Sequence, residues 1–60
     1  MMREAILALI QSNESCYDIY IHTGVSQGII SDLRSGYRTL DDVSLKDAER
    51  LYDYAQRLAA

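Results

Sequence analysis

The segment 16–36 constrains the fold of this 60-residue chain more than any other stretch. It is bounded and divided by residues that start and stop helices. Ser15 and Ser26 are good N-caps, while Gly24 and Gly36 favour the left-handed backbone that ends a helix. Because Gly24 and Ser26 are so close in sequence, the chain must turn tightly between them. We therefore predict two short helices joined by a tight turn.

The hydrophobic pattern extends the helical prediction to the rest of the chain. Apolar residues recur at helical spacing before and after the central segment, and no alternating pattern is long enough to indicate a β-strand. Ser44 and Asp47 have the spacing of a cap at the start of the last helix. A polar connector over 37–43 can hold a short helical turn. The expected helices are 2–12, 16–22, 26–35 and 45–58.

Composition limits the class of protein. Residues 1–60 make one domain, and a hydrophobic fraction of 48% is enough for a small core. Cys16 is the only cysteine, which excludes an intrachain disulfide and cysteine-rich zinc sites. No apolar run approaches the roughly 20 residues of a membrane span, and no cleavage site follows the apolar start. We expect a cytoplasmic protein that does not contact membranes.

The run from Thr23 to Gly36, TGVSQGIISDLRSG, resembles the helix-turn-helix of the Cro/C1-type (lambda-repressor-like) family of phage and bacterial regulators. The following segment, SLKDAERLYDYA, is similar to the helix that commonly comes next in such domains. The resemblance covers most of the chain from about Ser15 onward. It implies an all-α, compact lambda-repressor-like DNA-binding domain of four or five helices. Helix 26–35 would then be the recognition helix that enters the major groove of DNA.

The same resemblance implies two groups of DNA contacts. Gln27 falls on an early recognition-helix position, where an amide can pair with the N6 and N7 edge of adenine. Cys16 stands where the family often has a phosphate-binding glutamine, and Ser15 and Tyr17 supply nearby hydroxyls. The expected base-reading residues are Gln27, Gly28, Ser31 and Asp32, and the expected phosphate contacts are Ser15, Tyr17, Arg34, Arg38 and Thr39.

Two features of the sequence depart from what such a domain usually has. Tyr20 occupies a position where the family has a small alanine, so its side chain must either widen the crossing of the two helices or reach the surface. The net charge is −3 and the isoelectric point is near 4.7. Such a balance opposes phosphate binding in general, although the local patch facing a ligand matters more than the total.

Two functions remain open. The first is a sequence-specific DNA-binding regulator, such as a small repressor, that acts as a homodimer on a two-fold operator. The second is a protein-interaction module on the same scaffold, such as an antagonist of another regulator, because one scaffold hosts several functions. Residues off the core stripes and near the end of the last helix are the expected dimer contacts: Tyr54, Leu58 and Leu7.

Catalysis and metal binding find no support in the sequence. No nucleophile is paired with a base, and the carboxylates are scattered along solvated faces. His22 and Cys16 are too far apart on a helix to share a face as metal ligands. We therefore expect no enzymatic activity, no cofactor, no metal and no small-molecule substrate.

Overall fold

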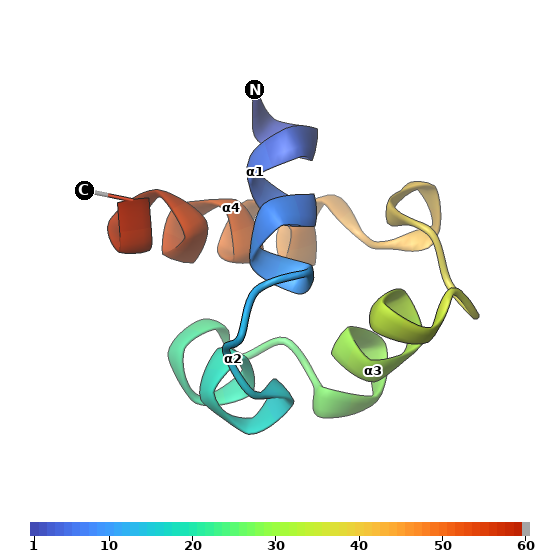
Figure 1. Ribbon diagram of the computed structural model, residues 1–60. Coiled ribbons are helices and arrows are strands. Elements are labelled where there is room, and N and C mark those ends of the chain that lie inside the picture. Colours follow the sequence, from blue (N-terminus) through green and yellow to red (C-terminus); the bar gives the residue numbers. More distant parts are fainter. Residues whose placement is uncertain (60) are drawn as a thin grey trace.

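The computed structural model describes residues 1–59, and these form an all-helical unit without strands (Figure 1). The all-α class expected from the sequence is confirmed for this part of the chain. A short 3-10 turn lies in the connector before the last helix, where a helical turn was expected. The elements are α1 (Met2–Ile10), α2 (Cys16–Thr23), α3 (Gln27–Ser35), η1 (Leu40–Asp42) and α4 (Leu45–Ala59).

The predicted helix ends are correct to within one or two residues. The largest difference is at α1, which ends at Ile10 rather than at Ser12. The Ser12 hydroxyl donates to the carbonyl of Leu9 at 2.6 Å and accepts from the Glu14 N–H at 3.2 Å. These local bonds compete with helical hydrogen bonding, which explains the early end of α1.

The predicted caps and stops are confirmed. The hydroxyls of Ser15, Ser26 and Ser44 each accept a hydrogen bond from the backbone N–H three residues later, at 3.0, 3.3 and 3.1 Å. Gly24 and Gly36 end α2 and α3 with φ of 78° and 87°. In this left-handed region a side chain would strain the backbone, so both turns require glycine.

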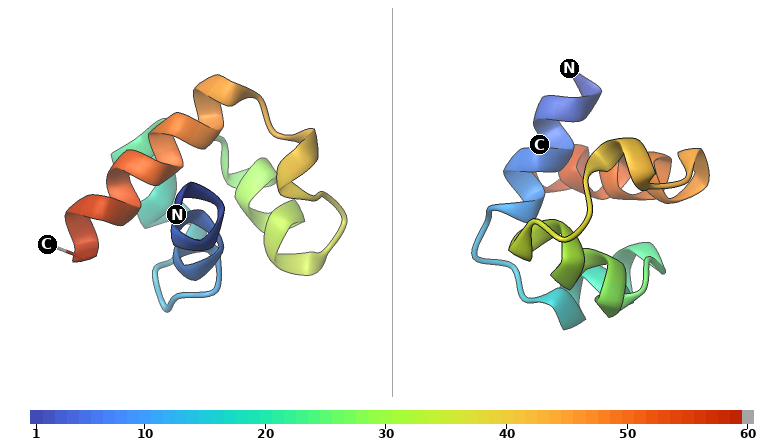
Figure 2. Two further views of the ribbon diagram at one scale, coloured as in Figure 1. Left: turned by 90° about the horizontal axis from the view of Figure 1, so that it is seen from above. Right: turned by 90° about the vertical axis from the view of Figure 1, so that its right-hand side faces the viewer.

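All four helices contribute to one core. In two views, α1 crosses α4, while α2 and α3 lie together on one side of that crossing (Figures 1 and 2). Val25, in the connection between α2 and α3, is also buried. The connection between these two helices is therefore fixed by packing as well as by Gly24. The buried apolar residues are Ile6, Leu9, Ile10, Ile19, Val25, Ile30, Leu51 and Tyr54.

Tyr54 belongs to this core, which corrects its expected role as an exposed dimer contact. Only 8% of its surface is accessible. Its hydroxyl donates to Glu14 Oε1 at 2.5 Å, and its ring stacks on His22 with centroids 4.9 Å apart. The helical pattern placed Tyr54 at the edge of the core. In the fold, Glu14 in the connection after α1 and His22 of α2 cover its side chain.

Candidate functional site

The exposed polar face of α3 is the clearest candidate site. Gln27, Gly28 and Ser31 are exposed along it, whereas Ile30 on the opposite side is fully buried. Among the described residues, neither the Gln27 amide nor the Ser31 hydroxyl has a hydrogen-bond partner. Both polar groups are therefore available to a ligand that approaches this face.

Gly28 leaves the middle of this face open. A Cβ atom built on Gly28 would have no neighbour within 4 Å. The backbone of α3 is thus accessible here, and a partner surface can approach it closely. Gly28 offers no side chain for recognition, so Gln27 and Ser31 carry the hydrogen-bonding capacity of the face.

Asp32 and Arg38 form a half-buried pair at the end of α3. Arg38 Nη2 lies 3.5 Å from Asp32 Oδ2, and the Arg38 backbone N–H donates to the Asp32 carbonyl at 3.2 Å. Arg38 Nε is buried and has no partner among the described residues. The cation offsets the charge of the only acidic side chain on α3. The two side chains expected to contact DNA are therefore half-buried and paired with each other.

Arg34 does not lie along this face. Its guanidinium donates to the Ile10 carbonyl at 2.7 Å, to the Ser12 carbonyl at 3.4 Å and to the Glu14 carbonyl. A further contact joins Nη1 to Cys16 Sγ at 3.6 Å. The side chain expected to contact phosphate is therefore engaged with the connection between α1 and α2. Backbone carbonyls leave no signal in a sequence, so sequence reasoning missed this arrangement.

The hydroxyl side chains around α2 and η1 are exposed, but two of them already have partners. The Ser15 hydroxyl serves as the cap of α2, and the Thr39 hydroxyl donates to Asp42 at 3.4 Å. Tyr17 is 55% exposed and its ring centroid lies 6.3 Å from that of Tyr20. Tyr20 is itself 42% exposed. Of the two outcomes expected for Tyr20, its side chain reaches the surface.

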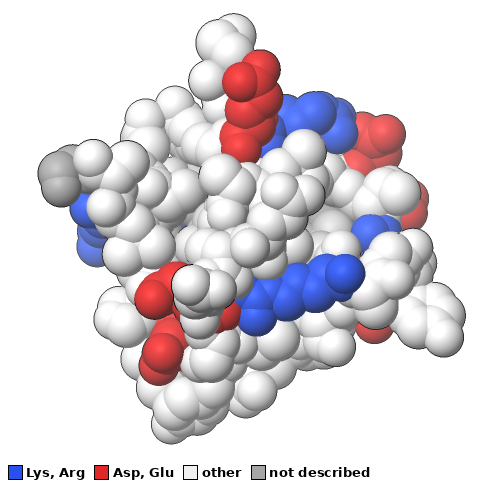
Figure 3. Space-filling model, in the orientation of Figure 1, with Lys and Arg blue, Asp and Glu red and all other residues white. Residues whose placement is uncertain are grey.

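Ion pairing neutralises much of the positive charge. Exposed pairs join Arg3 to Asp41 at 2.7 Å and Arg57 to Asp53 at 2.9 Å, the latter as expected from their spacing. Basic and acidic atoms lie close together in several places on the face shown in Figure 3, without one continuous basic patch. Arg50, which sequence reasoning did not single out, lies near the turn after α2. Its Nη1 is 3.4 Å from the position of a Cβ on Gly24.

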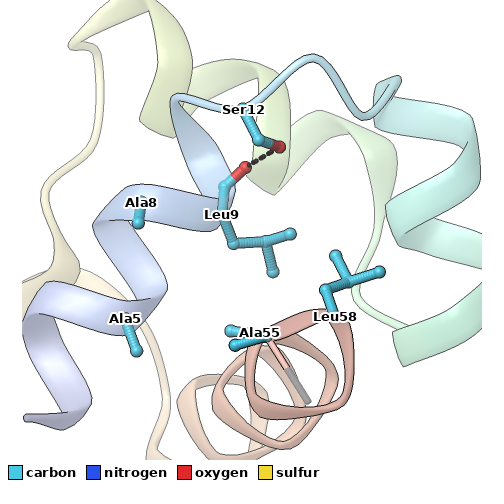
Figure 4. Close-up of a pocket in the computed structure, with 7 residues that line it drawn as sticks. Ala5, Ala8, Leu9, Ser12, Ala55 and Leu58 are labelled. Carbon is cyan, nitrogen blue, oxygen red and sulfur yellow. Dashed lines mark hydrogen bonds between the residues drawn. The ribbon is translucent and has the colours of Figure 1, made fainter.

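A shallow apolar groove lies between α1 and α4, away from α3. It has a volume of about 280 Å³ and is lined mainly by alanine and leucine (Figure 4). Leu58, expected as a dimer contact, points into this groove and is 51% exposed. Leu7, the other remaining dimer candidate, is exposed on α1 but lies beside a different hollow, next to Leu33 and Arg34.

Residues 1–59 contain neither a metal site nor a membrane-spanning helix. No group of three or more His, Cys, Asp or Glu side chains in this range is arranged to hold a metal ion. Within the same range, every helix is too short or too polar to cross a membrane.

Comparison with known protein-family models finds no match for the sequence, and comparison with curated proteins finds none either. The function is therefore inferred from the chain's own residues and from the motif in its central segment.

Proposed function

We propose that this chain is a lambda-repressor-like helix-turn-helix domain that binds duplex DNA as a transcriptional regulator. The observation that best supports the proposal is the contrast between the two sides of α3. One side buries Ile30 in the core, and the other exposes Gln27, Gly28 and Ser31. The tight connection through Gly24 between α2 and this helix also supports the proposal, because a helix-turn-helix has two helices joined by a short turn. An exposed polar helix of this kind suits the major groove of B-DNA.

In the proposed complex, the residues of α3 have different roles. The Gln27 amide would pair with adenine N6 and N7, and the Ser31 hydroxyl would contact a neighbouring base. Gly28 would let the α3 backbone approach the base edges. Asp32, once released from Arg38, would accept from the N4 amine of cytosine. The arrangement therefore favours sites that contain adenine and cytosine in adjoining positions.

Phosphate contacts would flank this helix. Tyr17 projects from the start of α2, while Arg38 and Thr39 follow α3 in sequence. Ser15 lies at the N-terminal end of α2, where backbone N–H groups favour an anion. The Arg38 guanidinium would exchange its weak pairing with Asp32 for a phosphate oxygen. Such contacts set the position of the protein on the duplex but carry no sequence information.

We propose a homodimer as the working unit. A single α3 with few unpaired cations offers little affinity, whereas two linked copies make the second binding event effectively intramolecular. Half-sites about one helical turn apart would then match a two-fold protein. Leu58 and the groove that it lines are the proposed contact, and a Leu58→Asp variant should sediment as a monomer at tens of micromolar. A wild-type protein that is itself monomeric under those conditions would contradict the dimer.

One observation favours a second candidate function, a protein-interaction module. Three arginines are paired with carboxylates, which reduces attraction to phosphate. The outer side of α2 exposes Tyr17, Tyr20 and Ile21, and exposed aromatic side chains are common in protein interfaces. Under this alternative the chain would bind another regulator rather than an operator.

Selection from random-sequence duplexes at low salt, followed by gel-shift titration, separates these functions. Gln27→Ala should weaken binding to the selected duplex by about 1–3 kcal/mol and relax the preference at one base pair. Gln11→Ala, which changes an exposed glutamine after α1, is the matched control and should bind as wild type. Arg38→Ala should weaken binding to all duplexes and lower the salt dependence. If no duplex is enriched by selection and none is shifted by the wild-type protein, the DNA proposal is contradicted and a protein partner is favoured.

A further inference from the structure

We propose that Arg34 is a positioning residue that fixes the orientation of α2 and α3 relative to each other, and not a phosphate contact. This inference rests on the proposed DNA-binding function for its consequence, but the positioning itself is a property of the free protein. The guanidinium lies at the one place where the end of α1, the start of α2 and the end of α3 come together.

The acceptors of Arg34 come from successive parts of the chain. Ile10 is the last residue of α1, where carbonyls have no partner within the helix and the helix dipole is negative. Ser12 and Glu14 contribute carbonyls from the connection, and Cys16 is the first residue of α2. A single side chain of α3 therefore holds the path of the chain from α1 into α2.

Glu14 is held from a second direction. Its backbone carbonyl accepts from Arg34 of α3, while its carboxylate accepts from the hydroxyl of Tyr54 in α4. The Tyr54 ring also stacks on His22 near the end of α2. The connection before α2 is thus attached to both later helices, and Arg34 is the attachment that involves α3.

These polar contacts matter for α2 because the helix buries few side chains. Only Ile19 and Thr23 are buried within it. The Thr23 hydroxyl makes its bonds within the same turn, to the Ile19 carbonyl and the Val25 N–H. The angle at which α2 lies against α3 therefore depends on what holds its first residues. Loss of the Arg34 contacts would change the angle between α2 and α3. The side chains of α3 and the hydroxyls of α2 could then no longer contact one duplex at the same time.

The shape of arginine distinguishes positioning from a phosphate contact. Arg34 uses all three guanidinium nitrogens, in a planar arrangement that a lysine ammonium cannot reproduce. Lysine nevertheless keeps the positive charge, which is sufficient for a phosphate contact. Arg34→Lys should therefore abolish positioning while preserving any attraction to phosphate.

The first experiment measures affinity for the selected duplex and for a random duplex across a range of salt concentrations. We expect Arg34→Lys to weaken binding to the selected duplex at least tenfold, as much as Arg34→Gln does. Affinity for the random duplex and the slope against salt should stay as in wild type. Arg57→Lys, at an exposed ion pair on α4, is the control and should change neither. Near-normal binding by Arg34→Lys, with a slope reduced by about one in Arg34→Gln, would establish a phosphate contact and overturn the proposal.

A second experiment tests positioning without DNA, and so separates it from the proposed function. Hydrogen exchange of the Asp18 and Ile19 backbone amides, which bond Ser15 at the start of α2, should be several times faster in Arg34→Lys than in wild type or Arg57→Lys, while the circular dichroism spectrum stays helical. In wild type, the Arg34 Nε–H should give a resolved NMR signal with contacts to Ile10. An averaged, rapidly exchanging Nε–H signal would overturn the proposal even if the variants fail to fold. If the Nε–H signal of wild type is resolved and amide exchange is faster in Arg34→Lys, then absence of duplex binding would count against the DNA function alone.

Discussion

The two longer connections of this molecule are held in place by different means. The connection over 11–15 depends on side chains from distant helices, chiefly Arg34 and Tyr54. The connection over 36–44 is held mostly by its own neighbours, through the left-handed Gly36, backbone bonds near η1 and the half-buried Asp32–Arg38 pair, and among the described residues only one exposed ion pair links it to distant α1. The first should therefore respond strongly to single changes elsewhere in the fold, and the second should respond to few changes outside itself.

The largest effect is expected from a matched pair of tyrosine substitutions. Tyr54→Ala removes a buried ring that closes the first connection, and should lower the free energy of unfolding by about 3–5 kcal/mol, as large aromatic truncations do. Tyr37→Ala changes a side chain that is 89% exposed in the second connection, and should stay within about 0.5 kcal/mol of wild type. Urea unfolding followed by circular dichroism measures both. Equal losses of unfolding free energy in the two variants would show that the two connections do not differ in how they are held.

A smaller effect is expected from the Tyr54 hydroxyl alone. Its hydrogen bond to the Glu14 carboxylate, together with burial and nearby negative charge, raises the pKa of Tyr54 from 10.0 to about 12. The protonated hydroxyl therefore stabilises the fold below pH 10, and that contribution is lost as the pH rises from about 10 to about 12. Tyr54→Phe should cost about 1.5 kcal/mol at neutral pH. The melting temperature of Tyr54→Phe should fall less than that of wild type as the pH rises through the alkaline range. Parallel plots of melting temperature against pH would show that ionisation of the hydroxyl does not affect stability.

The second connection should be most sensitive at its glycine. Gly36→Ala places a Cβ on a backbone with φ of 87°, and should cost about 1 kcal/mol. Gly28→Ala is the control, because this glycine is in the first turn of α3, has open space around it and lacks a positive φ. The control should instead raise stability by about 0.5–1 kcal/mol. A Gly36→Ala melting temperature at or above that of wild type would mean that the turn does not require Gly36.

The smallest effect is expected where α1 meets the second connection. Arg3 and Asp41 form a short but exposed ion pair. Exposed pairs of this kind contribute little, so Arg3→Gln should change the free energy of unfolding by less than about 0.5 kcal/mol. Raising the salt concentration should change wild-type stability equally little. A loss comparable to that of Gly36→Ala would show that the second connection also depends on a distant side chain.

The difference between contacts that are local in sequence and contacts from distant helices explains which features the sequence could predict. Ser15, Ser26 and Gly24 act on backbone groups a few residues away, so their spacing predicted the starts and ends of helices. Arg34 and Tyr54 act on Glu14, which is distant in sequence, and nothing in the local pattern indicates that contact. The exposed face of α3 followed from periodicity alone. The positions of the arginines around it did not, since each depends on which carbonyl or carboxylate the fold brings near.

The open space at Gly28 has a consequence for how a protein of this design can evolve. New specificity usually requires a substitution that costs stability, so change is limited by how much stability a small fold can lose. At Gly28, a Cβ would meet no neighbour within 4 Å, and most side chains favour a helix more than glycine does. Under the proposed function, a lineage could therefore alter what α3 recognises by one substitution there without losing stability. Position 28 is accordingly where relatives with different targets should diverge first.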